Sequence, residues 1–207
     1  MTTSQLHRLP AALAVVSAAW CSPLSGQWRV GAEVGASRFW GGSVDTGGDH
    51  TSIRPYRPTT FGIGLERQTG RYAVGLRVQY AGASLALEGP DLTVSAEDAF
   101  TIVTVSPEVA VRVATVGAGN QIRLHAGPVI EHWALVDLDG RTRVGAQGAL
   151  SFDVPLGQHF GGTVLAGGAV TPSPYKEGEL DAGPNAPTYD LRTLWRRRFA
   201  VGLTYRL

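Results

Sequence analysis

Apolar side chains recur at every second position along most of this chain, and the last nine residues show the pattern most clearly. The apolar residues of segment 199–207 are Phe199, Val201, Leu203, Tyr205 and Leu207, and the residues between them are small or polar. A period of two is the side-chain repeat of a β-strand, whose successive residues face opposite sides. The helical spacing of 3.6 residues fits no part of the chain better. The chain is therefore predicted to be all-β.

The alternation divides residues 27–207 into eight strands, each with one apolar face that carries no charge. The segments are 28–37, 61–66, 72–80, 103–113, 122–131, 144–154, 160–170 and 199–207. Lipid excludes charge from such a face, since an Arg or Lys at the bilayer midplane costs about 2–4 kcal/mol on a barrel. A soluble sandwich has the opposite orientation, with its apolar faces inside. Alternation alone does not say which face points outward.

The lengths of the connections supply the direction. Outer-membrane barrels have short periplasmic turns and longer external loops. With a periplasmic N-terminus, every tight connection falls on the periplasmic side and the longer ones fall outside. The tight connections are 67–70, 115–120 and 155–158, a medium loop begins at 137–140, and the long loops are 37–59, 86–100 and 171–194. We predict an eight-stranded antiparallel up-and-down transmembrane β-barrel.

The first 26 residues read as an export signal, with a weak basic region at His7 and Arg8 followed by an apolar stretch from Leu9 to Trp20. Cleavage is expected before Gln27, so that residues 1–26 form the signal peptide and 27–207 the barrel domain. The chain's single cysteine, Cys21, then leaves with the signal. This excludes disulfides, a cysteine nucleophile and a thiolate metal site from the mature chain.

Two sets of side chains follow from this orientation. Aromatic girdles are expected where the membrane meets water, at Trp28, Tyr72, Phe152, Phe160, Tyr80, Phe100, Trp133 and Trp195. An eight-stranded barrel has an interior that side chains fill, and charged side chains there must be paired. The predicted ionic network of the lumen is Arg29, Glu33, Glu66, Arg77, Glu108, Arg112, Arg123, His125, Glu131, Asp153, Arg198 and Arg206.

The chain resembles the small eight-stranded outer-membrane barrels, the OmpA/OmpX-like membrane domain, over essentially all of 27–207. The resemblance rests on architecture and not on a tight motif. It implies that segment 199–207 is the signal read by the outer-membrane barrel assembly machinery, although this chain ends in Leu207 where the family most often ends in Phe. It also implies a location in the outer membrane of a didermic bacterium, in contact with outer-membrane lipids and lipopolysaccharide.

The remaining features exclude several functions. A net charge of +1 gives no field for nucleic acid. No histidine has metal-ligand spacing, and no cofactor motif is present. His125 lies near Glu108 and Glu131 without an obviously matched nucleophile. We therefore expect a monomeric barrel without enzymatic activity, with a closed lumen and a structural or surface-recognition role through its external loops. The alternatives are a narrow channel or binding barrel for small, hydrophobic molecules, an outer-membrane lipid hydrolase, and a soluble lipocalin-like binder.

Overall fold

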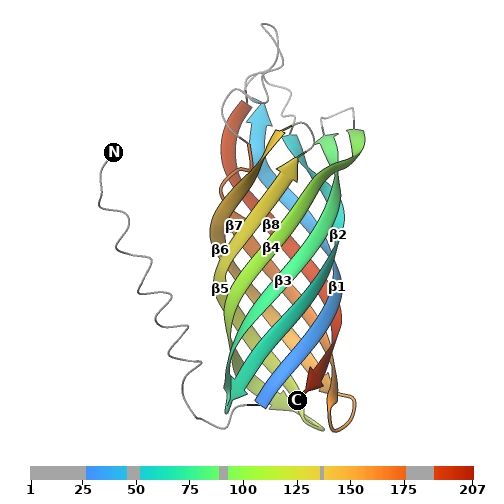
Figure 1. The fold of residues 1–207 in the computed structure, drawn as a ribbon, viewed down its shortest axis with the longest axis vertical. Coiled ribbons are helices and arrows are strands. Elements are labelled where there is room, and N and C mark those ends of the chain that lie inside the picture. Colours follow the sequence, from blue (N-terminus) through green and yellow to red (C-terminus); the bar gives the residue numbers. More distant parts are fainter. Residues whose placement is uncertain (1–26, 46–51, 89–92, 136–137, 176–188) are drawn as a thin grey trace, which may run out of the picture.

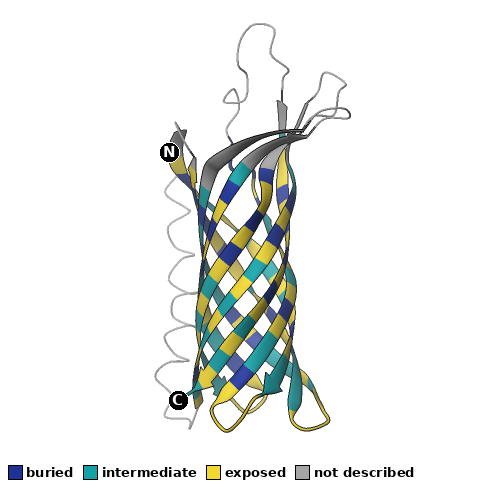
Figure 2. Ribbon diagram, turned by 90° about the vertical axis from the view of Figure 1, so that its right-hand side faces the viewer, coloured by how far each residue is buried: buried dark blue, intermediate teal, exposed yellow. Residues whose placement is uncertain are grey.

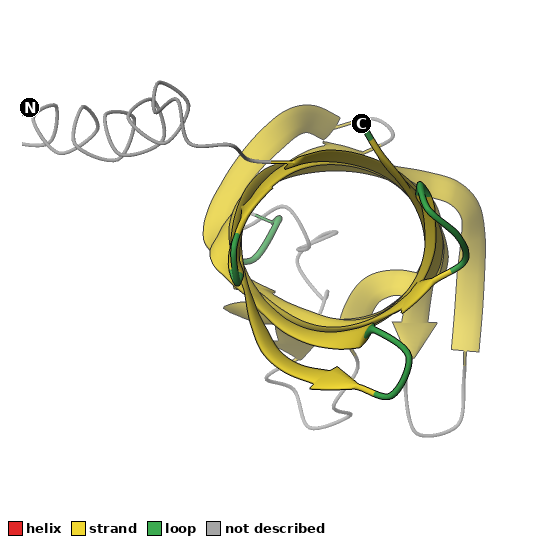
Figure 3. Ribbon diagram, turned by 90° about the horizontal axis from the view of Figure 1, so that it is seen from below, coloured by secondary structure: helices red, strands yellow, loops and turns green. Residues whose placement is uncertain are grey.

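Eight antiparallel strands close into a barrel in a computed structural model of the chain, each strand pairing with its sequence neighbours and β1 with β8 (Figures 1 and 3). The strands are β1 (Gln27–Asp45), β2 (Ser52–Thr69), β3 (Tyr72–Glu88), β4 (Thr93–Val116), β5 (Asn120–Leu135), β6 (Leu138–Pro155), β7 (Phe160–Thr171) and β8 (Tyr189–Arg206). The structure describes residues 27–45, 52–88, 93–135, 138–175 and 189–207, with side chains for 27–41, 55–84, 101–134, 140–175 and 191–207. The predicted signal peptide lies outside these residues. Nowhere in the described chain is a helix long and apolar enough to cross a membrane.

The apolar face of each strand points outward and the charged face inward. Ile63 and Leu203 are 64% and 59% exposed on the outer surface, whereas Glu131 is 1% exposed inside. Exposed and less accessible residues accordingly alternate along the strands in Figure 2. A soluble protein could not leave so much apolar surface in water. The outer surface is therefore suited to acyl chains, as the sequence predicts.

The tight turns and both barrel termini lie at one end of the barrel (Figure 1). Gly70 and Gly117 adopt positive φ values of 62° and 56° in two of these turns, a conformation that a side chain would disfavour. The backbone N–H of Leu207 donates to the carbonyl of Trp28 at 3.0 Å, which ties the C-terminus to the start of β1. The opposite end of the barrel, where β1, β3 and β5 end, is called the loop end below.

The strands extend much further toward the loop end than the sequence predicts. A tilted strand needs about 9–11 residues to cross a bilayer, whereas β4 has 24. The segments predicted as loops 37–59, 86–100 and 137–140 are largely strand, and β8 begins at Tyr189 within the predicted loop 171–194. Beyond the apolar belt the outer face of a strand no longer meets acyl chains, so an apolar outer face is no longer required although the hydrogen-bonded ladder continues.

Two prolines share one break in the β4–β5 ladder. Val105 pairs with Ile130 and Val109 with Ala126, so the same register would place Pro107 opposite Pro128, yet these residues form no bridge. Proline has no N–H to donate to a ladder. Placing both prolines at one position confines the loss to a single gap. A Cβ on Gly127 would collide with the carbonyl oxygen of Pro107, so the backbones approach closely there.

Candidate functional site: the barrel lumen

The turn end of the lumen is filled by a ring of two arginines and two carboxylates, called the lower ion cluster. Arg29 contacts Glu66 at 3.3 Å and Asp153 at 3.2 Å. Arg123 contacts the same carboxylates at 2.8 Å and 3.2 Å. Thr163 on β7 also donates its hydroxyl to Asp153. Each charge thus has two opposite partners, as burial of charge requires.

A second set of charges, the middle ion cluster, lies around Glu33. Arg77 bridges Glu33 at 2.6 Å and Glu108 at 2.8 Å. Glu33 also accepts from Arg198 at 3.2 Å and from Gln79 at 2.6 Å. The cluster holds two guanidinium groups and two carboxylates, so their formal charges cancel. Together with His125, which lies beside Glu108, the members of the cluster come from five strands.

Glu131 links the ionic part of the lumen to an apolar part. Its carboxylate lies 3.0 Å from Arg196 and accepts from the indole N–H of Trp133 at 3.2 Å and from Thr171 at 3.3 Å. Sequence alternation could have identified Arg196, because it lies on the same face of β8 as Arg198. The prediction nevertheless omitted it, together with the inward-facing Arg141 and Arg143 on β6.

The loop end of the lumen is closed by an apolar cap. Phe39 and Trp133 pack edge to face with ring centroids 5.8 Å apart. Buried around them lie the remaining members of the cap, Ala81, Ala83, Ile102, Tyr175 and Leu194. Burial raises the pKa of the Tyr175 phenol, whose oxygen has no hydrogen-bond partner among the described residues.

The segment 172–175 follows β7 and packs into the lumen as part of this cap. Arg141 donates to the carbonyl of Pro174 at 2.8 Å, and Arg143 donates to that of Ser173 at 2.6 Å. Pro174 and Tyr175 are buried. The first residues of the predicted long loop 171–194 are therefore a plug, held by two arginines through backbone oxygens, a contact that face alternation cannot predict.

Glu108, His125 and Ser151 stand in the order of a hydrolytic triad. His125 Nε2 lies 2.9 Å from the Ser151 hydroxyl, and His125 Nδ1 lies 3.4 Å from Glu108. A base between a hydroxyl and an acid can activate a nucleophile. These three residues line a cavity of about 60 Å³, however, whereas ligand pockets measure about 300–1,000 Å³. Such a cavity admits a few waters and no lipid substrate.

Most residues of the predicted ionic network meet in the two ion clusters or at Glu131, with two exceptions. Arg112 and Arg206 lie at the turn end, half-buried, and neither has a carboxylate within salt-bridge distance among the described residues. The backbone N–H of Arg112 donates to the carbonyl of Arg71 at 2.7 Å.

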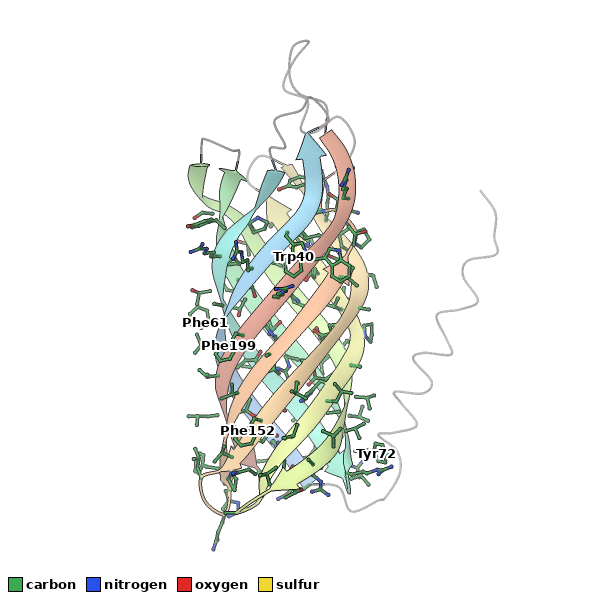
Figure 4. The ribbon with its side chains drawn as sticks, turned by 180° about the vertical axis from the view of Figure 1, so that it is seen from behind. Trp40, Phe61, Tyr72, Phe152 and Phe199 are labelled. Atoms are coloured by element: carbon green, nitrogen blue, oxygen red, sulfur yellow. The ribbon has the colours of Figure 1, made fainter. Side chains whose placement is uncertain are left out.

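Most aromatic residues of the predicted girdle face outward, whereas Trp133 faces the lumen and cannot belong to a girdle. Trp133 is 0% exposed inside the barrel because it shares the face of Glu131. The Phe100 side chain lies outside the described residues. Figure 4 shows Tyr72 and Phe152 near the turn end and Trp40 toward the loop end. The outward-facing members of the predicted girdle are Trp28, Tyr72, Tyr80, Phe152, Phe160 and Trp195.

Solved structures with this architecture are outer-membrane proteins. Neisserial surface protein A has a TM-score of 0.59 at 8% identity, over 87% of this chain and 97% of that one. OprG from Pseudomonas aeruginosa has a TM-score of 0.54 at 13% identity, over 88% and 96%. The outer membrane protein AlkL has a TM-score of 0.50 at 11% identity, over 88% and 90%. No protein-family model matches the sequence, and a search of curated proteins gives no match.

At sequence identities of 8–13%, these similarities show a shared fold and nothing more specific. The chain has the fold of the small outer-membrane barrels, as its resemblance to the OmpA/OmpX-like domain predicts. Together with the apolar outer surface, this fold supports the predicted localisation in the outer membrane, surrounded by its lipids.

Proposed function

We propose that this protein is a non-conducting outer-membrane barrel with a structural or surface-recognition role, carried by the strands that project beyond the bilayer. The observation behind the proposal is the closure of the lumen at successive levels. The lower and middle ion clusters fill one part, and the apolar cap with segment 172–175 fills the other. A path for solutes would have to break both a charge-balanced network and an apolar packing.

Single-channel recording in planar bilayers tests closure. The refolded protein is expected to give no conductance steps. Replacing residues 173–175 by Gly-Gly-Ser removes the plug and leaves the ion clusters intact, so the variant is also expected to be silent. A matched variant that adds Arg29→Ala and Glu66→Ala removes one oppositely charged pair as well, and is expected to conduct. Steps from the unaltered protein would contradict the proposal.

The surface role is tested by shortening the projecting strands. The strands of the hairpins β1–β2 and β3–β4 are longer than a bilayer requires. Replacing residues 42–54 and 85–100 each by a tight turn shortens both hairpins and retains Phe39, Ala81, Ala83 and Ile102 of the apolar cap. The shortened protein is expected to insert and resist detergent as before, while surface attachment by cells that carry it falls. Unchanged attachment, with the shortened protein present at the surface, would reject surface recognition and leave a structural role.

The apolar cap favours one second candidate, a binding site for a small hydrophobic molecule. Displacing Tyr175 would open a chamber between Phe39, Ile102, Trp133 and Leu194. Titration of the refolded protein with a small aromatic probe, followed by tryptophan fluorescence, separates the two functions. Saturable quenching that Trp133→Phe abolishes would favour the binding barrel.

We further propose that the protein is not an enzyme, since the cavity beside Ser151 is too small for a lipid. Phospholipid and lipopolysaccharide turnover by the refolded protein is expected to equal that of Ser151→Ala. Turnover lost in that variant would reverse the conclusion. Two proposals about biogenesis accompany it. N-terminal sequencing is expected to begin at Gln27, and charge placed at Leu203 is expected to impair assembly by the barrel machinery.

A further inference from the structure

Among the described side chains, negative charges face the lumen, whereas the charges on the outer surface are positive. The five carboxylates whose side chains are described all face the lumen: Glu33, Glu66, Glu108, Glu131 and Asp153. The charged side chains that are exposed or half-exposed outside the lumen are all arginines: Arg38, Arg57, Arg67, Arg71, Arg192 and Arg197. The surface that faces the membrane and its headgroups therefore carries positive charge without compensating negative charge in the described chain.

Three of these arginines converge on the outer wall of β1, β2 and β8. Arg38 and Arg197 are direct cross-strand partners on β1 and β8. Both line, with Arg57 of β2, a shallow groove of about 370 Å³, here called the arginine groove. Like charges directly opposite each other destabilise a sheet. None of the three has a carboxylate within salt-bridge distance in the part of the chain with described side chains.

The position of Arg57 requires an unfavourable backbone conformation. Its φ of 39° is the one positive value of a non-glycine residue among those described. A register shift between Tyr56 and Thr59 marks a bulge, and Tyr56 and Arg57, although consecutive, are both exposed. Bulges re-aim side chains near functional sites, and strain of this kind persists where the surrounding structure imposes it. The bulge at this position places Arg57 beside Arg38 and Arg197 in the lining of the groove.

The groove lies at the height of lipid headgroups. Ten residues separate Trp28 at the turn end from Arg38, which in a tilted strand amounts to roughly 25 Å, the height of a barrel's apolar belt. Above the groove, Trp40 and Trp195 stack with centroids 6.4 Å apart, and Arg197 lies over the Trp40 ring at 4.7 Å. Below it, Ala36 and the exposed Phe199 continue into the belt. Figure 4 shows Phe199 on the turn-end side of Trp40.

We propose that Arg38, Arg57 and Arg197 bind a phosphate group of an anionic lipid in the leaflet at the loop end. Guanidinium groups match phosphate geometry with two parallel donors each. An acyl chain of the same lipid packs on Ala36 and Phe199, which a free phosphate could not contact. The bound phosphate relieves the repulsion between Arg38 and Arg197. The proposal does not rest on the closed lumen or on the surface-recognition role.

Binding is measured with the full refolded chain in uncharged detergent micelles. Fluorescently labelled lipopolysaccharide is titrated and its anisotropy recorded, beside the same lipid after enzymatic removal of its phosphates. The dephosphorylated lipid is expected to bind at least about ten-fold more weakly, because each charged contact is lost. Millimolar inorganic phosphate is not expected to displace the lipid. Displacement by inorganic phosphate, or equal binding of the two lipids, would overturn the proposal.

The variants separate this groove from general attraction of charge. R38Q/R57Q/R197Q is expected to bind at least about ten-fold more weakly. The control R67Q/R71Q removes two outward arginines from the turn end and is expected to bind as the unaltered protein does. Equal weakening by the control, or unchanged binding by the triple variant, would refute a specific site.

Arg57→Gly keeps the proposal testable if the triple variant fails to fold. Glycine tolerates the positive φ, so its unfolding midpoint in urea is expected to stay equal or rise, while lipid affinity falls about three-fold or more. A more stable barrel with weaker binding is the signature of strain held for a ligand. Unchanged affinity would remove Arg57 from the site.

Discussion

Arg77→Ala is expected to lower the free energy of unfolding by about 3 kcal/mol, because it leaves two buried carboxylates short of a cation. Arg77 donates to Glu33 at 2.6 Å and to Glu108 at 2.8 Å, and all three side chains are nearly inaccessible. Breaking a buried ion pair costs about 3–5 kcal/mol. The lower value applies because Glu33 keeps Arg198 and Gln79, and Glu108 keeps His125.

Arg112→Ala is the matched control on the neighbouring strand. Arg112 faces the lumen by alternation but is half-buried and has no carboxylate partner among the described residues. Its loss is expected to cost less than about 1 kcal/mol. Urea unfolding of the refolded proteins, followed by tryptophan fluorescence and by gel mobility before and after boiling, gives both values. Arg77→Lys, which keeps the charge without the fork, is expected to fall between them.

Equal losses in Arg77→Ala and Arg112→Ala would refute the reasoning, because partner geometry would then not decide the cost. A loss below about 1 kcal/mol in Arg77→Ala would mean that water enters the lumen and solvates the carboxylates. A large gain of conductance in Arg77→Ala with unchanged stability would favour a solute path through the middle ion cluster.

Three further outcomes are expected. Ile63→Arg places charge on the lipid face and should lower the free energy of unfolding in bilayers by about 2–4 kcal/mol. Thr69→Arg at the rim should lower it by less than about 1 kcal/mol. Similar losses for the two variants in urea titrations in vesicles would mean that Ile63 is not immersed in the bilayer. Trp133→Ala removes the centre of the apolar cap and should lower the free energy of unfolding by about 3–5 kcal/mol. This loss should be well above that of Trp195→Ala on the outer surface. A larger loss in Trp195→Ala than in Trp133→Ala would place Trp133 outside the barrel. Burial raises the pKa of Tyr175 above the unfolded phenol's value of about 10, so the folded protein holds this proton more tightly than the unfolded chain does. The free energy of unfolding should therefore fall as the pH rises above about 10. The same alkaline loss in a Tyr175→Phe variant would show that Tyr175 is not the group responsible.

The sequence was sufficient for the strands and their orientation. A period of two identifies the face of each residue from its position alone, and the exclusion of charge from lipid marks the outward face. For this reason Arg29, Glu66 and Asp153 could be assigned to the lumen from the sequence alone. The same rule assigns Trp133 to the lumen, and the girdle prediction failed because it used closeness to a strand end in place of face.

Strand length could not be predicted from the same signal. Beyond the apolar belt, the outer faces of β1 through β4 no longer meet acyl chains, so the requirement for an apolar outer face ends while backbone hydrogen bonding continues. The sequence therefore indicates loops at 37–59 and 86–100, where the structure has projecting strands.

Partner choice inside the barrel depended on the tertiary structure. Alternation says that Arg198 and Glu33 face the lumen, but they are 165 positions apart and meet only because β1 closes the barrel on β8. The packing of Tyr175 into the cap, and the meeting of Arg57 with Arg38 and Arg197, likewise depend on register and on one bulge. Local sequence fixes the direction in which a side chain points, whereas ring closure and strand stagger fix what it reaches.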